Sequence, residues 1–510
     1  MEDKQIEAQP KKGFKAKLDN FFGISASGSS IKIEIIAGIA TFLAMVYILV
    51  VNPNNILYGG TADPRWSSVF IATAFGAVIG TLLMALLAKM PLTQAPGLGL
   101  NSAVGALVGG AAGIVFPLGT ALLLVFISGI IFLVLSIVPC GRNKKTGALM
   151  SLREKIFDGI PKPIRIAIPV GIGLFIAFIG LQNAKIIVDN PYTLVGLVKF
   201  NNISDYQTGG PAAQAVVCIT ALIIIGVLSH FKVKGAVIIG ILAGTVLGIP
   251  LHVTNIDILI GKTPGITWKF WENFGTYFSM DPASGGVFAS IFTEGFAGLS
   301  PEIAGTCVVT IISFCMIDMF DTMGTVVGIT SAVGMVDEDG KPHNYDKIMY
   351  SDSIATVTGA LMGTSTVTTF VESSVGVAAG GRTGLTALTT AILFFLAIFI
   401  LPVFAFIPSS AAAAALIYVG VLMMHSVVDI DFKNIKNAIP AFVTIIAMPL
   451  AYSITDGIGC GIITYVILAL ITYVADLIVA AIKHTEKPKF DLSVVMMVVF
   501  TLFVVYFATK

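Results

Sequence analysis

Residues 364–376 read TSTVTTFVESSVG, and they contain Glu372, the only charged side chain between Ser353 and Gly381. The first eight residues of this segment are mostly β-branched, which favours an extended backbone. The residues that follow Glu372 are small and compatible with a helix. The segment therefore predicts a short extended piece, then a carboxylate, then a half-helix, all within a strongly apolar part of the chain.

The composition indicates an integral membrane protein. Of the 510 residues, 56% are hydrophobic and 12% are charged, whereas soluble proteins carry roughly 25% charged residues. The apolar runs are long and continuous, which predicts membrane-spanning helices and not a β-barrel. About seven runs precede the polar connection Asn255–Ser300 and about seven follow it, so we expect about fourteen spans.

Basic residues are concentrated on one side of the predicted spans. They occur before the first span, within residues 142–165 after the fourth span, and at Lys232 and Lys234 after the sixth. The positive-inside rule then places the N-terminus and these loops in the cytoplasm of a multi-pass cell-membrane protein. The first twenty residues are polar and basic, so we expect no secretory signal. The net charge of +1 gives no reason to expect a nucleic acid partner.

An internal repeat relates the two halves of the chain. Asn101–Gly105 reads NSAVG and Glu372–Gly376 reads ESSVG, 271 positions later. The same offset aligns Ala44–Tyr47, AMVY, with Cys315–Asp318, CMID. With an odd number of spans in each half, the second half starts from the opposite side of the membrane. The two halves are then inverted repeats, which are typical of transporters.

The first half contains a broken segment at the matching position. Residues 91–100 read PLTQAPGLGL, and this combination of proline and glycine is incompatible with an ordinary membrane helix. Like Thr364–Val371, it predicts an extended piece before a half-helix. Backbone exposed at membrane depth is tolerated where it lines a cavity, so two such breaks predict a binding site near the midplane. Asn101 and Glu372 would begin the two half-helices, either as N-caps or as binding groups.

Two further carboxylates lie in residues 315–321, CMIDMFD. The spacing of Asp318 and Asp321 predicts that both lie on one helix face. Two buried carboxylates on one face repel each other, which favours a proton on one of them near neutral pH. Membrane-embedded carboxylates are costly and are usually functional. The alternative for either residue is a solvated position at the cytoplasmic end of the span, or a capping role.

These stretches carry a family resemblance over nearly the whole chain. The sequence resembles the nucleobase:cation symporters of the nucleobase–ascorbate superfamily, and within them the adenine/guanine/hypoxanthine permeases, or AzgA-like proteins. The most specific stretches are Ile33–Ile56, Ala95–Val104 (APGLGLNSAV), Phe314–Ile329 and Thr364–Gly384. The first span shows no Gln-His pair beside Tyr47, which separates this chain from the xanthine/urate branch and removes a histidine proton relay.

The resemblance implies an all-α membrane fold with fourteen spans as a seven-plus-seven inverted repeat, and with short antiparallel strands in spans 3 and 10. A core domain would comprise spans 1–4 and 8–11, and a gate domain spans 5–7 and 12–14. The expected divisions are a cytoplasmic segment 1–30, a first repeat 31–254, a connection 255–300, a second repeat 301–482 and a tail helix 483–510. Residues 492–508 are apolar enough for a further span or an interfacial helix.

The resemblance also implies the site. Asp318 and Glu372 would contact the base, Asn101 would be a further binding residue, and Asp321 would support binding or coupling. Phe370 either stacks on the base or packs in the core. Asp318, Asp321 and Glu372 are the proton-coupling candidates, with sodium held by the Thr364–Thr369 stretch as the alternative.

The expected function is import of a purine nucleobase (adenine, guanine or hypoxanthine) by proton symport with alternating access. The expected partners are the purine, protons and the lipid bilayer, and a homodimer through the gate domain is possible. The scattered cysteines and histidines give no metal, cofactor or disulfide spacing, and no enzyme motif is present. The remaining alternatives are transport of uracil, xanthine or an inorganic anion such as sulfate by the same fold, a channel, and a membrane enzyme.

Overall fold

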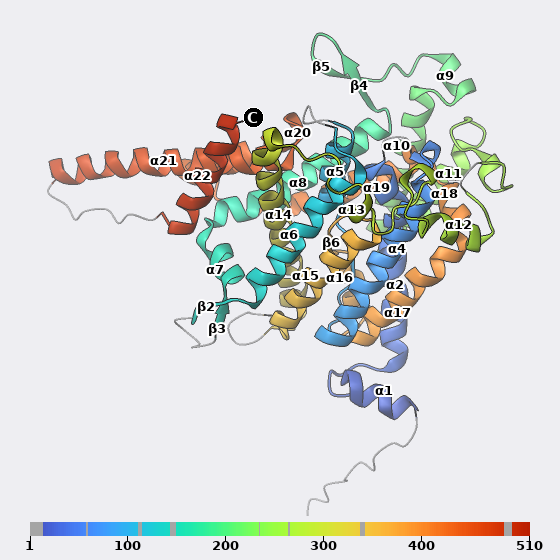
Figure 1. The fold of residues 1–510 in the computed structure, drawn as a ribbon, viewed down its shortest axis with the longest axis horizontal. Coiled ribbons are helices and arrows are strands. Elements are labelled where there is room, and N and C mark those ends of the chain that lie inside the picture. Colours follow the sequence, from blue (N-terminus) through green and yellow to red (C-terminus); the bar gives the residue numbers. More distant parts are fainter. Residues whose placement is uncertain are drawn as a thin grey trace, which may run out of the picture.

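The computed structural model describes residues 14–57, 60–110, 115–142, 149–233, 235–263, 266–336, 342–483 and 492–509, and these residues are mostly helical (Figure 1). The predicted N-terminal segment and tail therefore lie partly outside the described residues, as does most of the acidic loop that follows Val336. Helix α1 and the hairpin β2–β3 lie at one end of the molecule, and the hairpin β4–β5 lies at the other (Figure 1).

The elements of the first half run from α1 to α11. They are α1 (Phe14–Phe22), α2 (Ile31–Met45), α3 (Ile48–Ile56), α4 (Trp66–Leu83), β1 (Gln94–Pro96), α5 (Leu98–Val108), α6 (Leu118–Ile137), β2 (Pro139–Arg142), β3 (Leu149–Ser151), α7 (Leu152–Gly159), α8 (Lys162–Asn183), β4 (Ile187–Asn190), β5 (Leu194–Leu197), α9 (Ile203–Thr208), α10 (Pro211–His230) and α11 (Ala236–Gly248).

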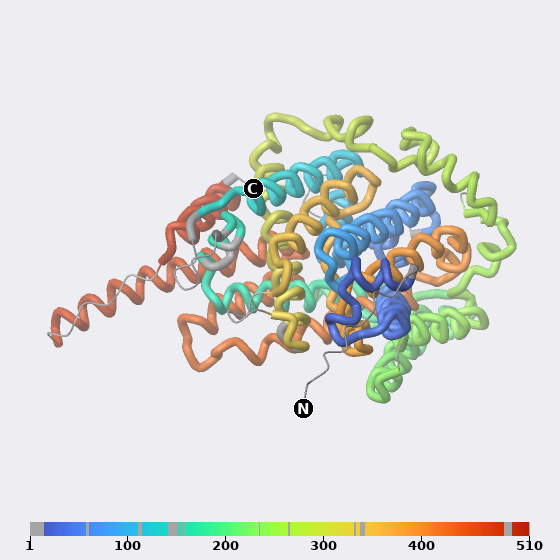
Figure 2. The backbone as a smooth tube through the Cα atoms, turned by 90° about the horizontal axis from the view of Figure 1, so that it is seen from below, coloured from blue at the N-terminus to red at the C-terminus, as the bar shows by residue number. Residues whose placement is uncertain are grey.

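The connection and the second half follow. Their elements are α12 (Phe270–Tyr277), α13 (Ser290–Thr293), α14 (Ala304–Ala332), α15 (Tyr345–Met362), β6 (Val367–Thr369), α16 (Ser373–Ala378), α17 (Gly384–Ala397), α18 (Leu401–Ala405), α19 (Ser409–Met424), α20 (Ile435–Leu450), α21 (Ile454–Lys483) and α22 (Val494–Thr509). In Figure 2 the connection 255–300 runs around the outside of the helices that surround the strands.

Nine helical stretches in the described ranges are long and apolar enough to cross a membrane. They are Ile31–Ile56, Trp66–Ala88, Leu118–Ile137, Lys162–Asn183, Pro211–His230, Pro301–Thr330, Gly384–Ala405, Ser409–Asp429 and Ile454–Lys483. Five shorter or more polar helices complete the fourteen predicted spans: the half-helices α5 and α16, the short helices α11 and α20, and α15, which contains Asp346, Lys347 and Asp352. The all-α prediction is confirmed. A search for long apolar helices misses the other five spans because they are short, broken or charged.

The two broken spans meet as predicted. Strands β1 and β6 pair antiparallel, with Gln94 opposite Thr369 and Pro96 opposite Val367. Pro96 and Gly97 prevent a continuous helix, and β6 consists of β-branched residues that prefer extended backbone. Gly97 is required for the close crossing, because a Cβ at this position would lie 2.8 Å from Thr368 Oγ1.

The packing of the helices follows an inverted repeat. If each helix of α2–α11 is exchanged with its equivalent in α14–α21, each major helix–helix contact is mapped onto another contact that the structure also has. Helix α2 packs on α17 as α14 packs on α6, and α17 packs on α4 as α15 packs on α6. Likewise α20 packs on α8 as α10 packs on α19. The pairs α4 with α15 and α8 with α19 join equivalent helices, as expected at a pseudo-twofold axis.

Two groups of helices result. The core helices, α2–α6 and α14–α17, enclose the strand pair, and the gate helices, α8, α10, α11 and α19–α21, pack mainly on each other. The groups meet where α8 contacts α5 and α14 and where α19 contacts α3. We propose that these groups are the core and gate domains, with the residue boundaries expected from the sequence.

The tail ends in helix α22. It packs against α21, α14 and α7, so it touches gate helices, core helices and the connection between them. Tyr506 on α22 donates a hydrogen bond of 3.0 Å to Asp456 Oδ1 on α21. Residues 484–491 lie outside the described residues.

Candidate functional site

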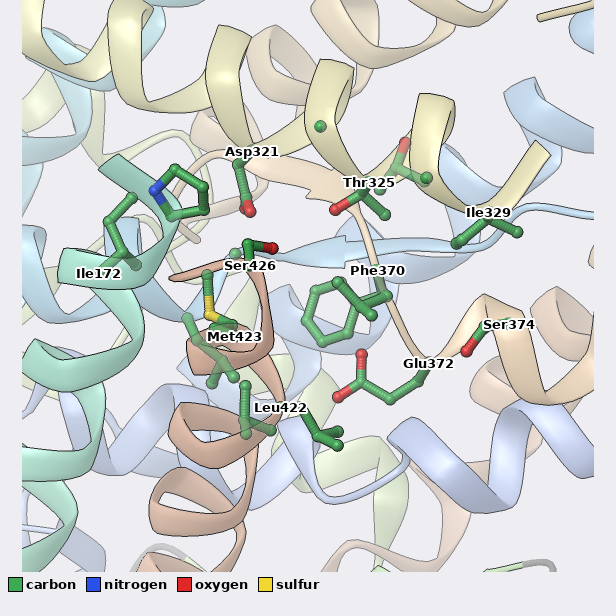
Figure 3. A pocket seen from close by; sticks show the side chains of 18 of the residues that line it. Ile172, Asp321, Thr325, Ile329, Phe370, Glu372, Ser374, Leu422, Met423 and Ser426 are labelled. Atoms are coloured by element: carbon green, nitrogen blue, oxygen red, sulfur yellow. The ribbon is translucent and has the colours of Figure 1, made fainter. Parts of the chain in front are cut away.

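A cavity of about 600 Å³ lies between the core helices and the gate helices. Its walls come from α14, from residues 369–378 around the end of β6, from the start of α5, and from α8 and α19 with the turn after it. Most lining side chains are apolar, and the polar ones include Asp321, Thr325, Glu372, Ser374 and Ser426 (Figure 3). This size and this apolar lining with a few polar groups are typical of sites for small organic molecules.

Glu372 lies at the turn between strand β6 and half-helix α16, and its carboxylate faces the cavity (Figure 3). It occupies the N-cap position of α16, but its backbone is already helical and its side chain caps no N–H group. Instead, its carboxylate accepts a hydrogen bond from the Tyr47 hydroxyl. The simple capping interpretation of Glu372 is therefore wrong. The carboxylate is held in place by Tyr47, which lies at the break between α2 and α3.

Phe370 also lines the cavity, although its side chain is mostly buried. Its backbone N–H donates to Thr93 O at 3.0 Å, which extends the pairing of the two broken spans by one residue. In Figure 3 the ring lies between Asp321 and Glu372. The site thus presents an aromatic ring flanked by two carboxylates.

Asp321 on α14 lines the same cavity. Thr368 Oγ1, on strand β6, donates to Asp321 Oδ2 at 3.3 Å. This contact connects α14 to the strand pair and orients the carboxylate beside the cavity.

Asp318 does not line the cavity. Its carboxylate is 2% exposed, and its Oδ2 accepts a hydrogen bond of 3.0 Å from Thr356 on α15. Residues three apart on a helix differ by about 60° in direction. That difference lets Asp321 line the cavity while Asp318 bonds Thr356 on α15, so the two carboxylates make different contacts.

Asn101 is fully buried in the first turn of α5 and is not part of the cavity lining. Its Nδ2 donates to Pro96 O at 3.1 Å, and its Oδ1 accepts a hydrogen bond from the Ser365 hydroxyl. The half-helix begins at Leu98 with Gly97 as the N-cap residue, so Asn101 is not the cap. In this structure Asn101 joins α5 to its own strand and to the segment before β6.

Sequence reasoning missed four residues near the site: Tyr47, Gln94, Arg153 and Asp352. Gln94 Nε2 donates to Asp352 Oδ1 at 3.0 Å and to Thr369 Oγ1 at 3.4 Å. Arg153, which belongs to a segment that the basic residues assign to the cytoplasmic side, is fully buried beside Asp352. It is buried because α7 folds back against α6 and α14. A signal existed for Tyr47, since the repeat offset aligns it with Asp318.

No three His, Cys, Asp or Glu side chains are grouped closely enough to hold a metal ion within the described ranges. The chemistry that the cavity offers is therefore hydrogen-bond acceptance by carboxylates and hydroxyls, together with stacking on an aromatic ring.

Comparison with known proteins supplies the family. Residues 32–460 match the model described as the permease family. The chain belongs to this family of membrane transporters. This permease is 35% identical over 453 residues to the adenine permease AdeP of Escherichia coli K12, which covers 89% of this chain and 90% of AdeP. It is 36% identical to the guanine/hypoxanthine permease PbuO of Bacillus subtilis 168, covering 87% and 93% of the two chains. The resemblance drawn from the sequence is confirmed.

Solved structures confirm the fold of the permease. The transmembrane domain of the cyanobacterial bicarbonate transporter BicA superposes with a TM-score of 0.52 at 16% identity, covering 84% of this chain and 97% of BicA. SLC26A9 gives a TM-score of 0.55 at 11% identity, covering 90% of this chain and 69% of SLC26A9. At such low identity these matches establish the core-and-gate architecture alone.

Proposed function

We propose that this permease imports purine nucleobases, with adenine, guanine and hypoxanthine as the candidate substrates, by proton symport and alternating access. One observation carries the proposal: the cavity places two carboxylates, Asp321 and Glu372, beside the ring of Phe370. The names of the related permeases, which include adenine and guanine/hypoxanthine permeases, support the same substrate class.

The chemistry of a purine suits this arrangement. A neutral purine is a flat ring system with N–H donors along its edges, and an ionised carboxylate accepts hydrogen bonds only. We assign Glu372 and Asp321 as acceptors for these N–H groups and Phe370 as the stacking partner for the ring face. Asp321 takes the base-contacting role that the sequence suggested for Asp318. Asn101 joins the two broken spans beside the site, whereas Asp318 bonds Thr356 on α15.

The position of the cavity supports an inward-facing conformation. Its lining extends from Thr369 on β6 to Val333 beyond α14 and to Ser426 beyond α19. Helix α14 ends on the side of the molecule where α1 and the hairpin β2–β3 lie (Figure 1). We assign that side to the cytoplasm, because it carries the basic segments. Alternating access then follows from movement of the core helices relative to the gate helices.

Proton coupling is supported by the charge of the site. The described lining residues include the two carboxylates and no Lys, Arg or His. A neutral base brings no positive charge into this low-dielectric, acidic region, so a cation must be transported with it, and a proton is the simplest one. Sodium is the weaker alternative, because the hydroxyl groups of Thr364, Ser365 and Thr368 already bond Asn52, Asn101 and Asp321.

Anion transport is the rival function on this fold, since bicarbonate and anion transporters share the architecture. An anion site would use the half-helix N-termini and basic or neutral side chains. Here Glu372 lies directly before α16, and Asp321 lies across the cavity. Two carboxylates in this position oppose an anion.

The decisive test is uptake of radiolabelled adenine, guanine, hypoxanthine and uracil into cells that lack their own nucleobase permeases. We expect saturable uptake of at least one purine, insensitivity to excess sulfate, and loss of uptake in Glu372→Gln. Vesicles with separately imposed pH and sodium gradients then identify the coupling ion. Competition by sulfate but not by purines would refute the substrate class. Accumulation that follows sodium alone would refute proton coupling and leave the substrate class intact.

The homodimer through the gate domain also stays a prediction. Helix α21 is largely exposed along its second half, including Ile467, Ile471, Val474 and Ile478. Lipid or a second gate domain could cover this stripe, and single-molecule counting of labelled protein in bilayers would distinguish the two.

A further inference from the structure

A buried arginine lies outside the cavity lining. Arg153 belongs to α7, the short helix between α6 and α8, and its side chain is fully buried. Its guanidinium carbon lies 3.9 Å from the centre of the Phe132 ring, and Nη2 lies 3.8 Å from Asp352 Oδ2. None of its three side-chain nitrogens makes a hydrogen bond within the part of the chain that the structure describes. Burying a guanidinium without hydrogen bonds lowers the stability of the fold. A residue with a purely structural role would rarely be placed in this way.

Two carboxylates face this arginine from the core helices. Asp352 Oδ1 accepts hydrogen bonds from Thr322 at 2.7 Å and from Gln94 at 3.0 Å, whereas Oδ2 is left to Arg153. Asp318 accepts from Thr356 through Oδ2, and its Oδ1 has no hydrogen-bond partner among the described residues. The three side chains form one electrostatic group, which we name the Arg153 triad (Arg153, Asp318 and Asp352).

The charges of the triad do not balance. Two ionised carboxylates and one guanidinium leave one negative charge in a fully buried site. Within the described residues, Asp321 and Cys315, both on α14, also interact with the triad and bring no positive charge, and the side chain of Lys155 on α7 is exposed. Helices α4, α6 and α13 and strands β1 and β6 contribute no titratable side chain to this side. A single bound proton would neutralise the group.

The triad is connected both to the cavity and to the gate helices. From Asp352, the side chain of Gln94 reaches Thr369, which lines the cavity. In the other direction, α7 ends at Gly159 and the gate helix α8 begins at Lys162. A change at the triad can therefore reach the substrate site through the strand pair and the gate through α7.

We propose that the Arg153 triad binds the transported proton outside the substrate cavity, and that Arg153 transmits its binding to the gate helices through α7. With Asp352 ionised, Arg153 is attracted to it and α7 is held against the core. When the proton resides on Asp352, that attraction falls and α7 is released, so α8 can move. The proton enters and leaves as such, with no other bond formed or broken. The coupling role of the triad rests on the proposed purine transport. The existence of the triad as an ionic unit is independent of that function.

The ionic unit is tested first, without substrate, by thermal denaturation of purified protein at pH 8. The proteins are the wild type, Arg153→Met, Asp352→Asn and the double variant, with Lys155→Met as an exposed control on the same helix. Arg153→Met leaves two buried carboxylates without a cation, and Asp352→Asn removes the carboxylate that lies 3.8 Å from Arg153, whereas the double variant leaves Asp318 as the one charged group of the triad. We expect each single variant to lower the half-denaturation temperature and the double variant to recover at least half of the summed loss. Additive losses in the double variant would refute the triad.

The coupling is tested in proteoliposomes with radiolabelled adenine and hypoxanthine. Arg153→Met leaves two carboxylates, Asp352→Asn leaves a neutral pair, and the double variant returns to one carboxylate. Exchange of internal for external base should persist in all of them. Its rate should stay within about threefold of the wild-type rate, because no residue that lines the cavity is changed. Accumulation driven by a pH gradient should be lost in both single variants and in the double variant, because each of them lacks the proton site Asp352, the transmitting Arg153, or both.

Each result has a clear meaning. If Asp352→Asn, Arg153→Met or the double variant accumulates purine like the wild type, the coupling role of the triad is refuted. If the wild type exchanges no purine, the proposed function fails, and the denaturation experiment still decides whether the ionic unit exists.

Discussion

Two isosteric substitutions three residues apart on α14 separate substrate binding from coupling. Asp321 lines the cavity, whereas Asp318 is turned toward Thr356 and the Arg153 triad. Asp321→Asn removes an ionised acceptor for a purine N–H group, and hydrogen bonds to charged groups contribute about 1.5–3 kcal/mol. Since 1.4 kcal/mol corresponds to a factor of ten, the dissociation constant should rise roughly 10- to 150-fold. Asp318 contacts no part of the cavity, so Asp318→Asn should change this dissociation constant by less than about threefold.

The assay is equilibrium binding of radiolabelled hypoxanthine or adenine to the purified protein, which is independent of transport rate. Both variants should nevertheless lose pH-driven accumulation, Asp321→Asn through weak binding and Asp318→Asn through the altered charge of the triad. Thermal denaturation of each variant shows whether the fold is intact. If Asp318→Asn weakens binding as much as Asp321→Asn, the assignment of the two residues to different environments is wrong.

Three further predictions concern the ring, a half-helix and the tail. Phe370→Ala should weaken purine binding roughly 5- to 150-fold, because stacking on an aromatic side chain contributes about 1–3 kcal/mol, and Phe370→Trp should retain most of the affinity in the same binding assay. Gly376→Val should lower the half-denaturation temperature, because its Cβ would lie 2.8 Å from a backbone oxygen of α2, whereas Gly226→Val, with open space around it, should not. Tyr506→Phe removes the 3.0 Å hydrogen bond to α21, so proteolysis should release the tail helix faster than in the wild type.

Local chemistry made the centre of the fold predictable from sequence. Pro96 and Gly97 exclude a helix, the β-branched run before Phe370 favours a strand, and the repeat places the two breaks at equivalent positions. Glu372 stood out because a lone carboxylate in an apolar span is costly. Each of these signals depends on residues that are close in sequence, and the pairing of β1 with β6 followed from the inverted repeat.

The division of labour among the charged residues was not predictable in the same way. The directions of Asp318 and Asp321 depend on how α14 is rotated against its neighbours, and a three-residue spacing does not fix that rotation. Arg153 belongs to a basic segment that the positive-inside rule assigns to the cytoplasmic surface. Its burial depends on α7 packing beneath α6 and α14, which is a long-range contact with no local signature.

The repeat itself explains why binding and coupling can occupy different places. By the offset of 271, Tyr47 is equivalent to Asp318 and Glu372 to Asn101. In one copy the long tyrosine reaches across the halves and bonds Glu372 at the cavity. In the other copy the shorter aspartate bonds Thr356, and Asn101 bonds Ser365 and Pro96. Equivalent positions on a symmetric scaffold thus make different contacts, which leaves Glu372 at the substrate cavity and Asp318 in the Arg153 triad. Helix α14 carries both Asp318 and Asp321, so a rotation of this one helix would alter both sites together, and that is the minimum a symporter requires.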